Sequence, residues 1–423
     1  MVKIGDKGKG SDFPIVFLFA LLWGVVILDR SVVTYVFADE GFLQSTGFTN
    51  IHLGMITSAT SIGFALSSIF VSMTSDRLGR KKWFLIVFAL IAGIFSGSMA
   101  LTTVFVAIII IRLLTGVGEG PIFPLMSVIL AKQTNPKRFA NYQGAIQIAV
   151  AIASGIVGPM LTVSLVQNIS WNMTYLATAI PAIILALILI PVIKEKKEET
   201  LDSVTAVKSD NGTMAIKDFL PVVLKNRNVL ICMIANVLYN GIFWTFISYG
   251  PKFWVFDAVD NVTYESVGMI LAAMGLLGIM WCIVLPIIAN KVGRRPVTIA
   301  SAFAGGITLI AVGASGGAFF SMVLYCLFLG GMTFLTMLFV AIIPIETLPK
   351  KMAATASAFI MGVGELIGGV IVPPILGGVA DSFGLSKAFL IVGILSIVMG
   401  AICFFLNETL QKKTELGAKE ANA

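Results

Sequence analysis

Two oppositely charged side chains stand seven residues apart inside a long apolar stretch of this chain. Arg112 and Glu119 belong to an apolar run from about 104 to 131 that carries no other charge. Seven residues are two turns of an α-helix, so both side chains would share one helix face about 10 Å apart. A charge near the centre of a bilayer costs about 3 kcal/mol even on lenient insertion scales. Arg112 and Glu119 must therefore face a partner or a wet cavity.

Three further ionisable residues lie inside other apolar runs and extend the same chemistry. Asp29 and Arg30 are adjacent in an early run, and Glu365 lies in a late one. With Arg112 and Glu119 they sum to two positive and three negative charges, so a shared cavity is neutral only if one carboxyl is protonated or a cation is added. The protonation of these carboxyls would respond to whatever occupies the arginines. This pattern predicts proton coupling through Asp29, Glu119 and Glu365.

The two arginines are candidates for binding an anion. A guanidinium is always charged and can hold a carboxylate through two hydrogen bonds, which favours anion recognition by Arg30 and Arg112 in a water-lined site. The alternative is a structural salt bridge between the first and fourth helices. For Glu119 the alternative is permanent pairing with Arg112. Structural pairing accounts for Asp29 nearly as well as a functional role does.

The composition indicates that these charges are housed in a membrane protein. Of the 423 residues, 57% are hydrophobic and only 12% are charged, and the mean hydropathy is +0.97. Such values exclude an ordinary soluble protein. The formal net charge of +7 comes from basic residues in short loops between apolar runs. This distribution argues against a nucleic-acid partner and for a lipid bilayer.

The apolar runs predict an all-α polytopic membrane protein with twelve transmembrane helices in two six-helix bundles. The expected spans are 14–37, 53–74, 84–101, 104–131, 140–166, 171–193, 228–255, 266–288, 297–315, 319–344, 353–379 and 386–406. The longest polar stretch follows the sixth span and indicates a linker. The expected organisation is a cytoplasmic tail 1–13, an N-terminal bundle 14–193, a cytoplasmic linker 194–227, a C-terminal bundle 228–406 and a tail 407–423.

The basic residues also predict the orientation. Of the 29 Lys and Arg residues, 25 fall on the side of the two termini, and only Lys252 and Lys387 fall on the other side. Because Lys and Arg gather in cytoplasmic loops, both termini should lie in the cytoplasm. No cleavable signal peptide is expected before the first span, and the short loops favour a bacterial inner membrane. We expect a monomer.

An internal repeat links the two predicted bundles. The loop DRLGRKK after the second span is echoed by NKVGRRP after the eighth span, 214 residues later. The same offset places Gly155 on Gly369 and Pro159 on Pro373. This predicts a parallel duplication whose halves are related by an axis along the membrane normal.

The first of these loops resembles the signature loop of the major facilitator superfamily, and the twelve spans and the duplication fit that family over essentially the whole chain. An acidic side chain at a helix end can pair with neighbouring arginines in one conformation and release them in another. The resemblance implies a role in conformational gating for six residues: Asp76, Arg77, Gly79, Arg80, Gly293 and Arg294.

LDR in the first span and R-x6-E-G-P-x-F-P in the fourth together resemble the anion:cation symporter branch of that superfamily. The resemblance implies that Arg30 contacts the substrate carboxylate. It also implies that Asp29 and Glu119 take part in protonation and that Arg112 is the partner of Glu119. Glu365 departs from the sugar-acid members, which often carry asparagine in this part of the eleventh helix. Its charge would repel a second substrate carboxylate or add a proton site.

Polar side chains elsewhere in the spans are further candidates for substrate contacts. Tyr239 and Asn240 lie in the seventh span, and Gln147 lies in the fifth. The alternative for Tyr239 and Asn240 is packing or an interfacial position. The alternative for Gln147 is an interhelical hydrogen bond that only stabilises the bundle.

Other classes of protein fit the sequence less well. The four cysteines lie in separate apolar runs and His52 is the only histidine, so we expect no metal site and no cofactor other than protons. Without an HExxH motif or a GxSxG placed as a nucleophile elbow, we expect no enzyme. We expect a secondary transporter that carries a small organic anion, a carboxylate such as a sugar acid, in symport with protons. Partial Gly-Pro motifs leave an organic-anion exchanger or a proton-driven exporter as the alternative, and a non-transporting membrane sensor as a third.

Overall fold

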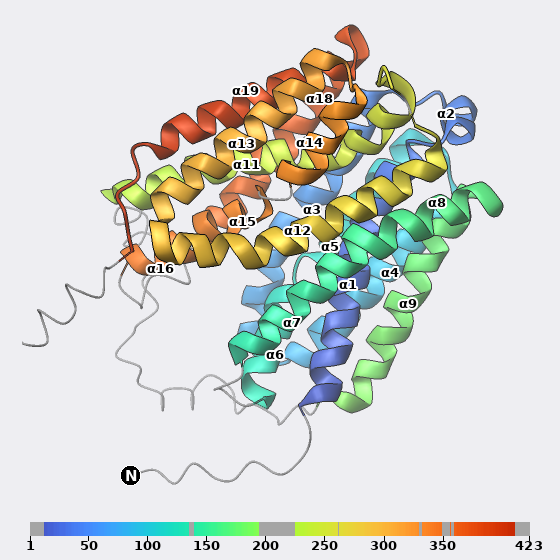
Figure 1. Ribbon diagram of the computed structural model, residues 1–423. Coiled ribbons are helices and arrows are strands. Elements are labelled where there is room, and N and C mark those ends of the chain that lie inside the picture. The colour runs from blue at the N-terminus through green and yellow to red at the C-terminus, as the bar shows by residue number, and fades with distance from the viewer. Residues whose placement is uncertain are drawn as a thin grey trace, which may run out of the picture.

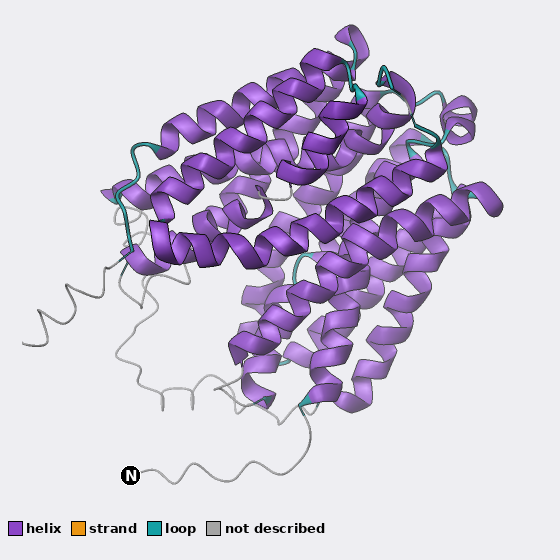
Figure 2. Ribbon diagram, in the orientation of Figure 1, coloured by secondary structure: helices purple, strands orange, loops and turns teal. Residues whose placement is uncertain are grey.

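Figure 1 shows the computed structural model of the chain, in which every described element is a helix (Figure 2). The structure describes residues 12–134, 139–193, 225–260, 262–329, 332–348, 356 and 359–410. No strand occurs in these ranges, so the predicted all-α class is confirmed.

We call the helices up to residue 193 the N-terminal half and those from residue 225 the C-terminal half. The N-terminal half contains α1 (Phe13–Val36), α2 (Glu40–Thr46), α3 (Asn50–Leu78), α4 (Lys81–Ser98), η1 (Met99–Leu101), α5 (Phe105–Glu119), α6 (Ile122–Gln133), α7 (Phe139–Ile152), η3 (Ala153–Val157), α8 (Gly158–Asn168) and α9 (Trp171–Val192). The C-terminal half contains α11 (Arg227–Lys252), η5 (Phe253–Asp257), α12 (Tyr264–Val292), α13 (Arg294–Ser315), α14 (Phe319–Leu329), α15 (Thr333–Thr336), η7 (Met337–Ile342), α16 (Ile343–Thr347), η8 (Gly364–Gly369), α18 (Val370–Phe383) and α19 (Leu385–Cys403).

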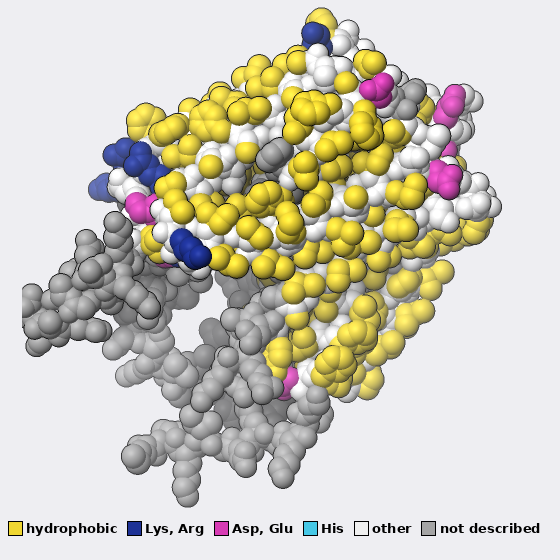
Figure 3. Space-filling model, in the orientation of Figure 1, with side chains coloured by type: hydrophobic (Ala, Val, Ile, Leu, Met, Phe, Trp, Pro, Cys, Tyr) yellow, Lys and Arg dark blue, Asp and Glu magenta, His cyan; other side chains and the backbone are white. Residues whose placement is uncertain are grey.

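These helices form the predicted set of membrane spans. Ten helical stretches in the described residues are long and apolar enough to cross a membrane, and α3 and the helices from Phe319 to Thr347 complete the twelve. Figure 3 shows hydrophobic side chains across most of the described face, with charged side chains towards the ends of the helices. A belt of this kind suits contact with lipid chains.

The fourth predicted span differs from the expected single helix. It is divided into α5, which ends at Glu119, and α6, which begins at Ile122. Gly120 and Pro121 separate the two, because proline has no N–H to continue the ladder of hydrogen bonds. The carboxylate of Glu119 therefore lies at a break in the helix. The short helix α2 in the loop after the first span was not predicted.

Close backbone contacts hold α5 against α3. A Cβ atom built on Gly116 would lie 2.1 Å from the backbone oxygen of Thr60, so only glycine permits this approach. In the same way a Cβ atom on Gly63 would lie 2.1 Å from the backbone oxygen of Leu113. These contacts place the charged residues of α5 close to α1 and α3.

The two halves meet at one end of the molecule, which we call the closed end. There the hydroxyl of Tyr249 donates to the backbone oxygens of Asn50, at 3.0 Å, and Pro373, at 2.8 Å. The carboxylate of Asp381 accepts from the backbone N–H groups of Asn50, at 2.8 Å, and Ile51, at 2.9 Å. In Figure 1 the ribbons of the two halves run close together near α2 and α8 and diverge towards α6 and α16, which we call the open end.

Two glycine contacts at the closed end are related by the offset of the repeat. A Cβ atom on Gly54 would lie 2.7 Å from the backbone oxygen of Pro373, and one on Gly268 would lie 3.3 Å from that of Pro159. Adding 214 to 54 and to 159 gives 268 and 373. Each half therefore presents a glycine to the equivalent proline of the other half, as a parallel duplication would produce.

Candidate functional site

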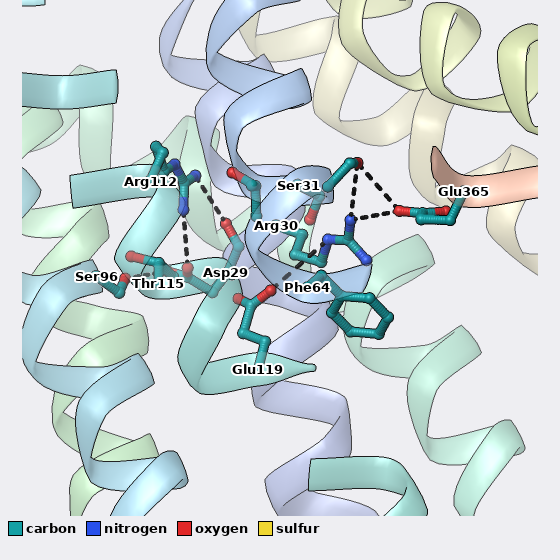
Figure 4. Close-up of polar contacts among 12 residues, drawn as sticks. Asp29, Arg30, Ser31, Phe64, Ser96, Arg112, Thr115, Glu119 and Glu365 are labelled. Atoms are coloured by element: carbon teal, nitrogen blue, oxygen red, sulfur yellow. Dashed lines mark hydrogen bonds and ion pairs between the residues drawn. The ribbon is translucent and has the colours of Figure 1, made fainter. Parts of the chain in front are cut away.

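Asp29 and Arg30 point to different sides of α1 and form two separate charge clusters (Figure 4). Successive residues of a helix are about 100° apart, so adjacent side chains can serve different neighbours. Asp29 faces α4, α5 and α9 within the N-terminal half, whereas Arg30 faces α3, α5 and the C-terminal half. Asp29 and Arg30 are therefore adjacent in the sequence but contact different partners in the fold.

The first cluster is a sealed ion pair between Asp29 and Arg112. Arg112 Nη1 lies 3.1 Å from Asp29 Oδ2, and Arg112 Nη2 donates to the backbone oxygen of Asp29 at 3.4 Å. The hydroxyl of Thr178 donates to Asp29 Oδ1 at 2.8 Å, and that of Ser96 donates to the same oxygen. The Arg112 side chain is only 1% exposed. This cluster satisfies a buried carboxylate with donors from three helices.

The second cluster joins the two halves through Arg30 and Glu365. Arg30 Nη2 lies 2.9 Å from Glu365 Oε1, although the two residues are 335 positions apart. Ser61 Oγ donates to the same oxygen at 3.0 Å, and Trp244 Nε1 donates to Glu365 Oε2 at 3.0 Å. The guanidinium carbon of Arg30 lies 4.7 Å from the ring centre of Phe64 and 4.2 Å from that of Trp244. Both contacts are within the range of cation–π attraction.

Glu119 is the third carboxylate and is held loosely. Its Oε2 lies 3.7 Å from Arg30 Nε and has no hydrogen-bond partner among the described residues, while its side chain is 1% exposed. Arg30 is thus shared between Glu119 of the N-terminal half and Glu365 of the C-terminal half (Figure 4). A buried oxygen without a donor is costly for a carboxylate.

The predicted pairing of Arg112 with Glu119 is not what the structure contains. Among the described residues, the carboxylate within ion-pair distance of Arg112 is that of Asp29, and the guanidinium within that distance of Glu119 is that of Arg30. The reason is that the side chains of Arg112 and Glu119 both reach α1, where Asp29 and Arg30 lie closer to them than the two helical turns that separate them along α5. All five buried ionisable residues nevertheless lie around the same segment of α1.

Space at this site is small in the conformation described. A cavity of about 10 Å³ lies beside the two arginines, lined by Arg30, Arg112, Trp244, Val33, Ile56, Thr57 and Thr60. That volume suits about one water molecule. The side chains of Arg30 and Glu365 remain 7% and 12% exposed.

The other residues predicted to contact substrate are Tyr239, Asn240 and Gln147, and the structure describes the side chains of the first two. Asn240 donates to the backbone oxygen of Asn236 at 2.9 Å, and its amide lies beside η8, next to Gly364. Tyr239 is buried and stacks on Phe243 with ring centres 5.7 Å apart. The side chain of Gln147 lies outside those the structure describes.

The predicted gating residues occupy the turns at the open end. Gly79 ends α3 with φ 64°, and Gly293 joins α12 to α13 with φ 124°, conformations that favour glycine. Arg80 is exposed, and the side chains of Asp76 and Arg77 lie outside those described. Arg294 Nη2 lies 2.8 Å from Glu346 Oε1, which ties the start of α13 to α16.

A carboxylate from the segment that follows α19 caps α13 beside this pair. Glu408 accepts from the backbone N–H groups of Arg294, at 2.8 Å, and Arg295, at 3.1 Å. Partial burial raises the pKa of Glu408, but hydrogen bonds from backbone N–H groups, with Leu410 and Arg294 foremost, outweigh it and hold the pKa below its usual value. This capping carboxylate was not predicted.

Ser61, Ser96, Thr178 and Trp244 complete the charge clusters but were not among the predicted site residues. A signal for Trp244 was present, because an offset of 214 places it opposite Arg30 in the repeat. Hydroxyl residues are common in membrane helices, so the sequence carried no signal for the other three. Among the described residues, no group of three or more His, Cys, Asp or Glu side chains could hold a metal ion.

Comparison with known proteins identifies the family. The profile of the Major Facilitator Superfamily matches residues 19–373, and the chain belongs to this family. The fold agrees: a bacterial homolog of the human lysosomal transporter Spinster, in an inward-facing and unoccupied conformation, superimposes with a TM-score of 0.76. That match covers 94% of this chain and 97% of the other at 15% identity, which shows the fold alone.

Several relatives are named for the small organic anions that they transport. The hexuronate transporter of Bacillus subtilis (strain 168) is 30% identical over 267 residues, which are 62% of this chain and 61% of that protein. The chain thus matches about three fifths of that relative's length. The glycerol-3-phosphate transporter of the same strain is 22% identical and covers 88% of both chains. The cis,cis-muconate transport protein of Acinetobacter baylyi is 22% identical over 94% of this chain and 95% of that protein. The chain is a multi-pass membrane transporter, and its relatives include transporters of organic acids.

Proposed function

We propose that this protein carries a small organic carboxylate across the membrane in symport with protons. The observation that carries the proposal is the position of Arg30, whose guanidinium lies between the two halves and holds a carboxylate at 2.9 Å. A fork of hydrogen-bond donors flanked by two aromatic rings suits a planar carboxylate. In the proposal, a substrate carboxylate binds Arg30 near the midplane.

Alternating access follows from the arrangement of the halves. The closed end is held by hydrogen bonds between the halves, among them those of Tyr249, Ser58 and Tyr264, and by the carboxylate of Asp381; such bonds can break and re-form. Rocking the halves about Arg30 would open this end and close the other. With the predicted orientation, the open end faces the cytoplasm and the described conformation is inward-facing.

We assign proton transfer to Glu119 and Glu365 and a positioning role to Asp29. Asp29 receives donors from Arg112, Ser96 and Thr178, so its charge is compensated in place. Glu119 and Glu365 instead share Arg30, and one guanidinium cannot fully compensate two carboxylates. A proton on either carboxyl relieves the excess negative charge, and an anion bound to Arg30 makes that proton necessary.

The substrate class follows from this chemistry together with the relatives' names. Hexuronate, muconate and glycerol phosphate are all small anions rich in oxygen, and the first two are carboxylates. We propose a carboxylate such as a sugar acid, carried by a monomer in a bacterial inner membrane, with both termini in the cytoplasm and no cofactor other than protons. The net direction is inward.

Uptake into proteoliposomes tests the proposed function. The panel comprises D-glucuronate, cis,cis-muconate, an aromatic acid and sn-glycerol 3-phosphate, each radiolabelled. We expect uptake of at least one carboxylate, its loss in Arg30→Ala, and its retention in Lys387→Ala, which removes an exposed cation at the start of α19. Uptake by Arg30→Ala equal to the wild type, or transport of the phosphate ester alone, would contradict the proposal.

A further inference from the structure

The carboxylate of Glu365 occupies a site made of three donors from three helices. Arg30 of α1 and Ser61 of α3 contact Oε1, at 2.9 and 3.0 Å, and Trp244 of α11 contacts Oε2 at 3.0 Å. We call these three residues the carboxylate cradle. Both carboxylate oxygens are satisfied, and the guanidinium carbon of Arg30 lies over the rings of Trp244 and Phe64. The cradle therefore has the chemistry of a site for a free carboxylate.

No room remains in the cradle for a second carboxylate. The adjoining cavity of about 10 Å³ holds about one water molecule, which is far less than a sugar acid or an aliphatic acid requires. Arg30 Nη2 donates both to Ser61, at 3.3 Å, and to Glu365, so this edge of the guanidinium is occupied. An external carboxylate can use these donors only when Glu365 has left them.

We propose that Glu365 is a tethered competitor that fills the substrate carboxylate subsite, so that an external carboxylate binds to Arg30, Ser61 and Trp244 in exchange for it. This inference rests on the proposed function only for the identity of the transported anion. It assigns Ser61 and Trp244 to the carboxylate subsite. It also keeps the charge on Arg30 compensated, because the external carboxylate replaces that of Glu365 on the same guanidinium.

A displaced Glu365 must be neutralised. The charged groups that face it are Arg30 from α1 and, across that guanidinium, Glu119 from α5; Ser61 of α3 and Trp244 of α11 are neutral. Once an anion holds Arg30, the cation no longer compensates Glu365, and Glu119 repels it. Glu365 therefore leaves with one proton, so that each carboxylate bound carries one proton with it.

Removal of the tethered carboxylate should create a binding site for small acids. In Glu365→Ala the cradle loses its occupant, and acetate or formate should fill it. We expect millimolar acetate to raise the unfolding temperature of purified Glu365→Ala saturably, by a few degrees, because a ligand that binds only the folded state stabilises it. Acetate should not affect the wild type or Glu40→Ala, which removes an exposed carboxylate on α2.

Double variants and a refolding experiment separate this proposal from its alternatives. The effect of acetate should be abolished when Arg30→Gln is added to Glu365→Ala and weakened when Trp244→Phe is added. No stabilisation of Glu365→Ala, or equal stabilisation of the wild type, would overturn the proposal. If Glu365→Ala is isolated only as aggregate, acetate throughout purification should restore folded protein whereas chloride should not, and failure of both would also overturn it.

Glu365→Gln provides a second test with a side chain of the same shape. The amide fills the space without a charge, but its NH2 group cannot accept the hydrogen bond that one of the Glu365 oxygens accepts, so acetate should stabilise this variant less than it stabilises Glu365→Ala. Uptake of D-glucuronate should rise towards acid pH in the wild type and become several-fold less dependent on pH in Glu365→Gln. An unchanged pH profile would count against the tethered competitor. Absence of D-glucuronate uptake by the wild type would instead count against that substrate, and the acetate experiment would still decide the role of Glu365.

Discussion

Breaking the sealed ion pair between Asp29 and Arg112 should destabilise the protein strongly. Asp29→Asn keeps the size of the side chain but leaves a guanidinium that is 1% exposed without its counterion. Removal of one partner of a buried ion pair typically costs about 3–5 kcal/mol. At about 2 °C per kcal/mol, the unfolding temperature should fall by about 6–10 °C. Glu40→Gln, which alters an exposed carboxylate, should change it by less than about 1 °C.

A double variant makes this prediction specific to the pair. Arg112→Gln combined with Asp29→Asn removes the orphaned charge and leaves two amides that can hydrogen-bond with each other and with Ser96. The double variant should therefore recover at least half of the stability lost by Asp29→Asn, measured by thermal unfolding in detergent. A double variant less stable than both single variants, or a loss of under about 1 kcal/mol in Asp29→Asn, would refute the reasoning from buried charge.

Three further predictions concern packing, the closed end and the open end. Gly116→Ala should cost about 1–3 kcal/mol in the free energy of unfolding, because its Cβ would lie 2.1 Å from a backbone oxygen, whereas Gly278→Ala, with no atom within 4 Å, should cost under about 0.5 kcal/mol. Equal costs would contradict the close approach. Asp381→Ala removes an acceptor of two backbone N–H groups, so spin-label distances across the closed end should show a several-fold larger open population, and an unchanged distribution would be the contrary result. Because the folded-state pKa of Glu408 is lowered, its contribution to stability is present above its unfolded pKa and is lost as the pH falls through the folded value. Glu408→Gln should therefore unfold at a lower temperature than the wild type near neutral pH, and a difference that grew with acidity would contradict this.

The twelve membrane helices could be predicted because hydropathy is a local property of the chain. Each span needs about 20 apolar residues whatever its neighbours are, and ten of the predicted spans overlap helical stretches of the described residues that are long and apolar enough to cross a membrane. The break after Glu119 was not predicted. Gly120 and Pro121 are residues typical of such a break, but the apolar run continues through them and a single helix was expected.

The buried ionisable residues could be predicted individually but not as pairs. The free energy needed to place a charge in the bilayer marks Arg30, Arg112 and Glu119 as residues that need a partner, whatever the fold. Their partners depend on how the helices are arranged: the side chain of Arg112 on α5 reaches Asp29 on α1, and the contact between the halves pairs Arg30 with Glu365 across 335 positions. Ser61 joins the site only through that docking, and nothing in its own neighbourhood distinguishes it from other hydroxyl residues of the spans.

The measurement that tests proton–anion symport most directly is proton flux driven by the substrate alone. Proteoliposomes containing an internal pH dye receive a carboxylate that supports uptake, without an imposed pH gradient. The account predicts internal acidification in the wild type, none in Arg30→Ala, and counterflow without acidification in Glu365→Gln. Rapid uptake by the wild type with no change in internal pH, together with full counterflow, would contradict proton coupling and identify an anion exchanger.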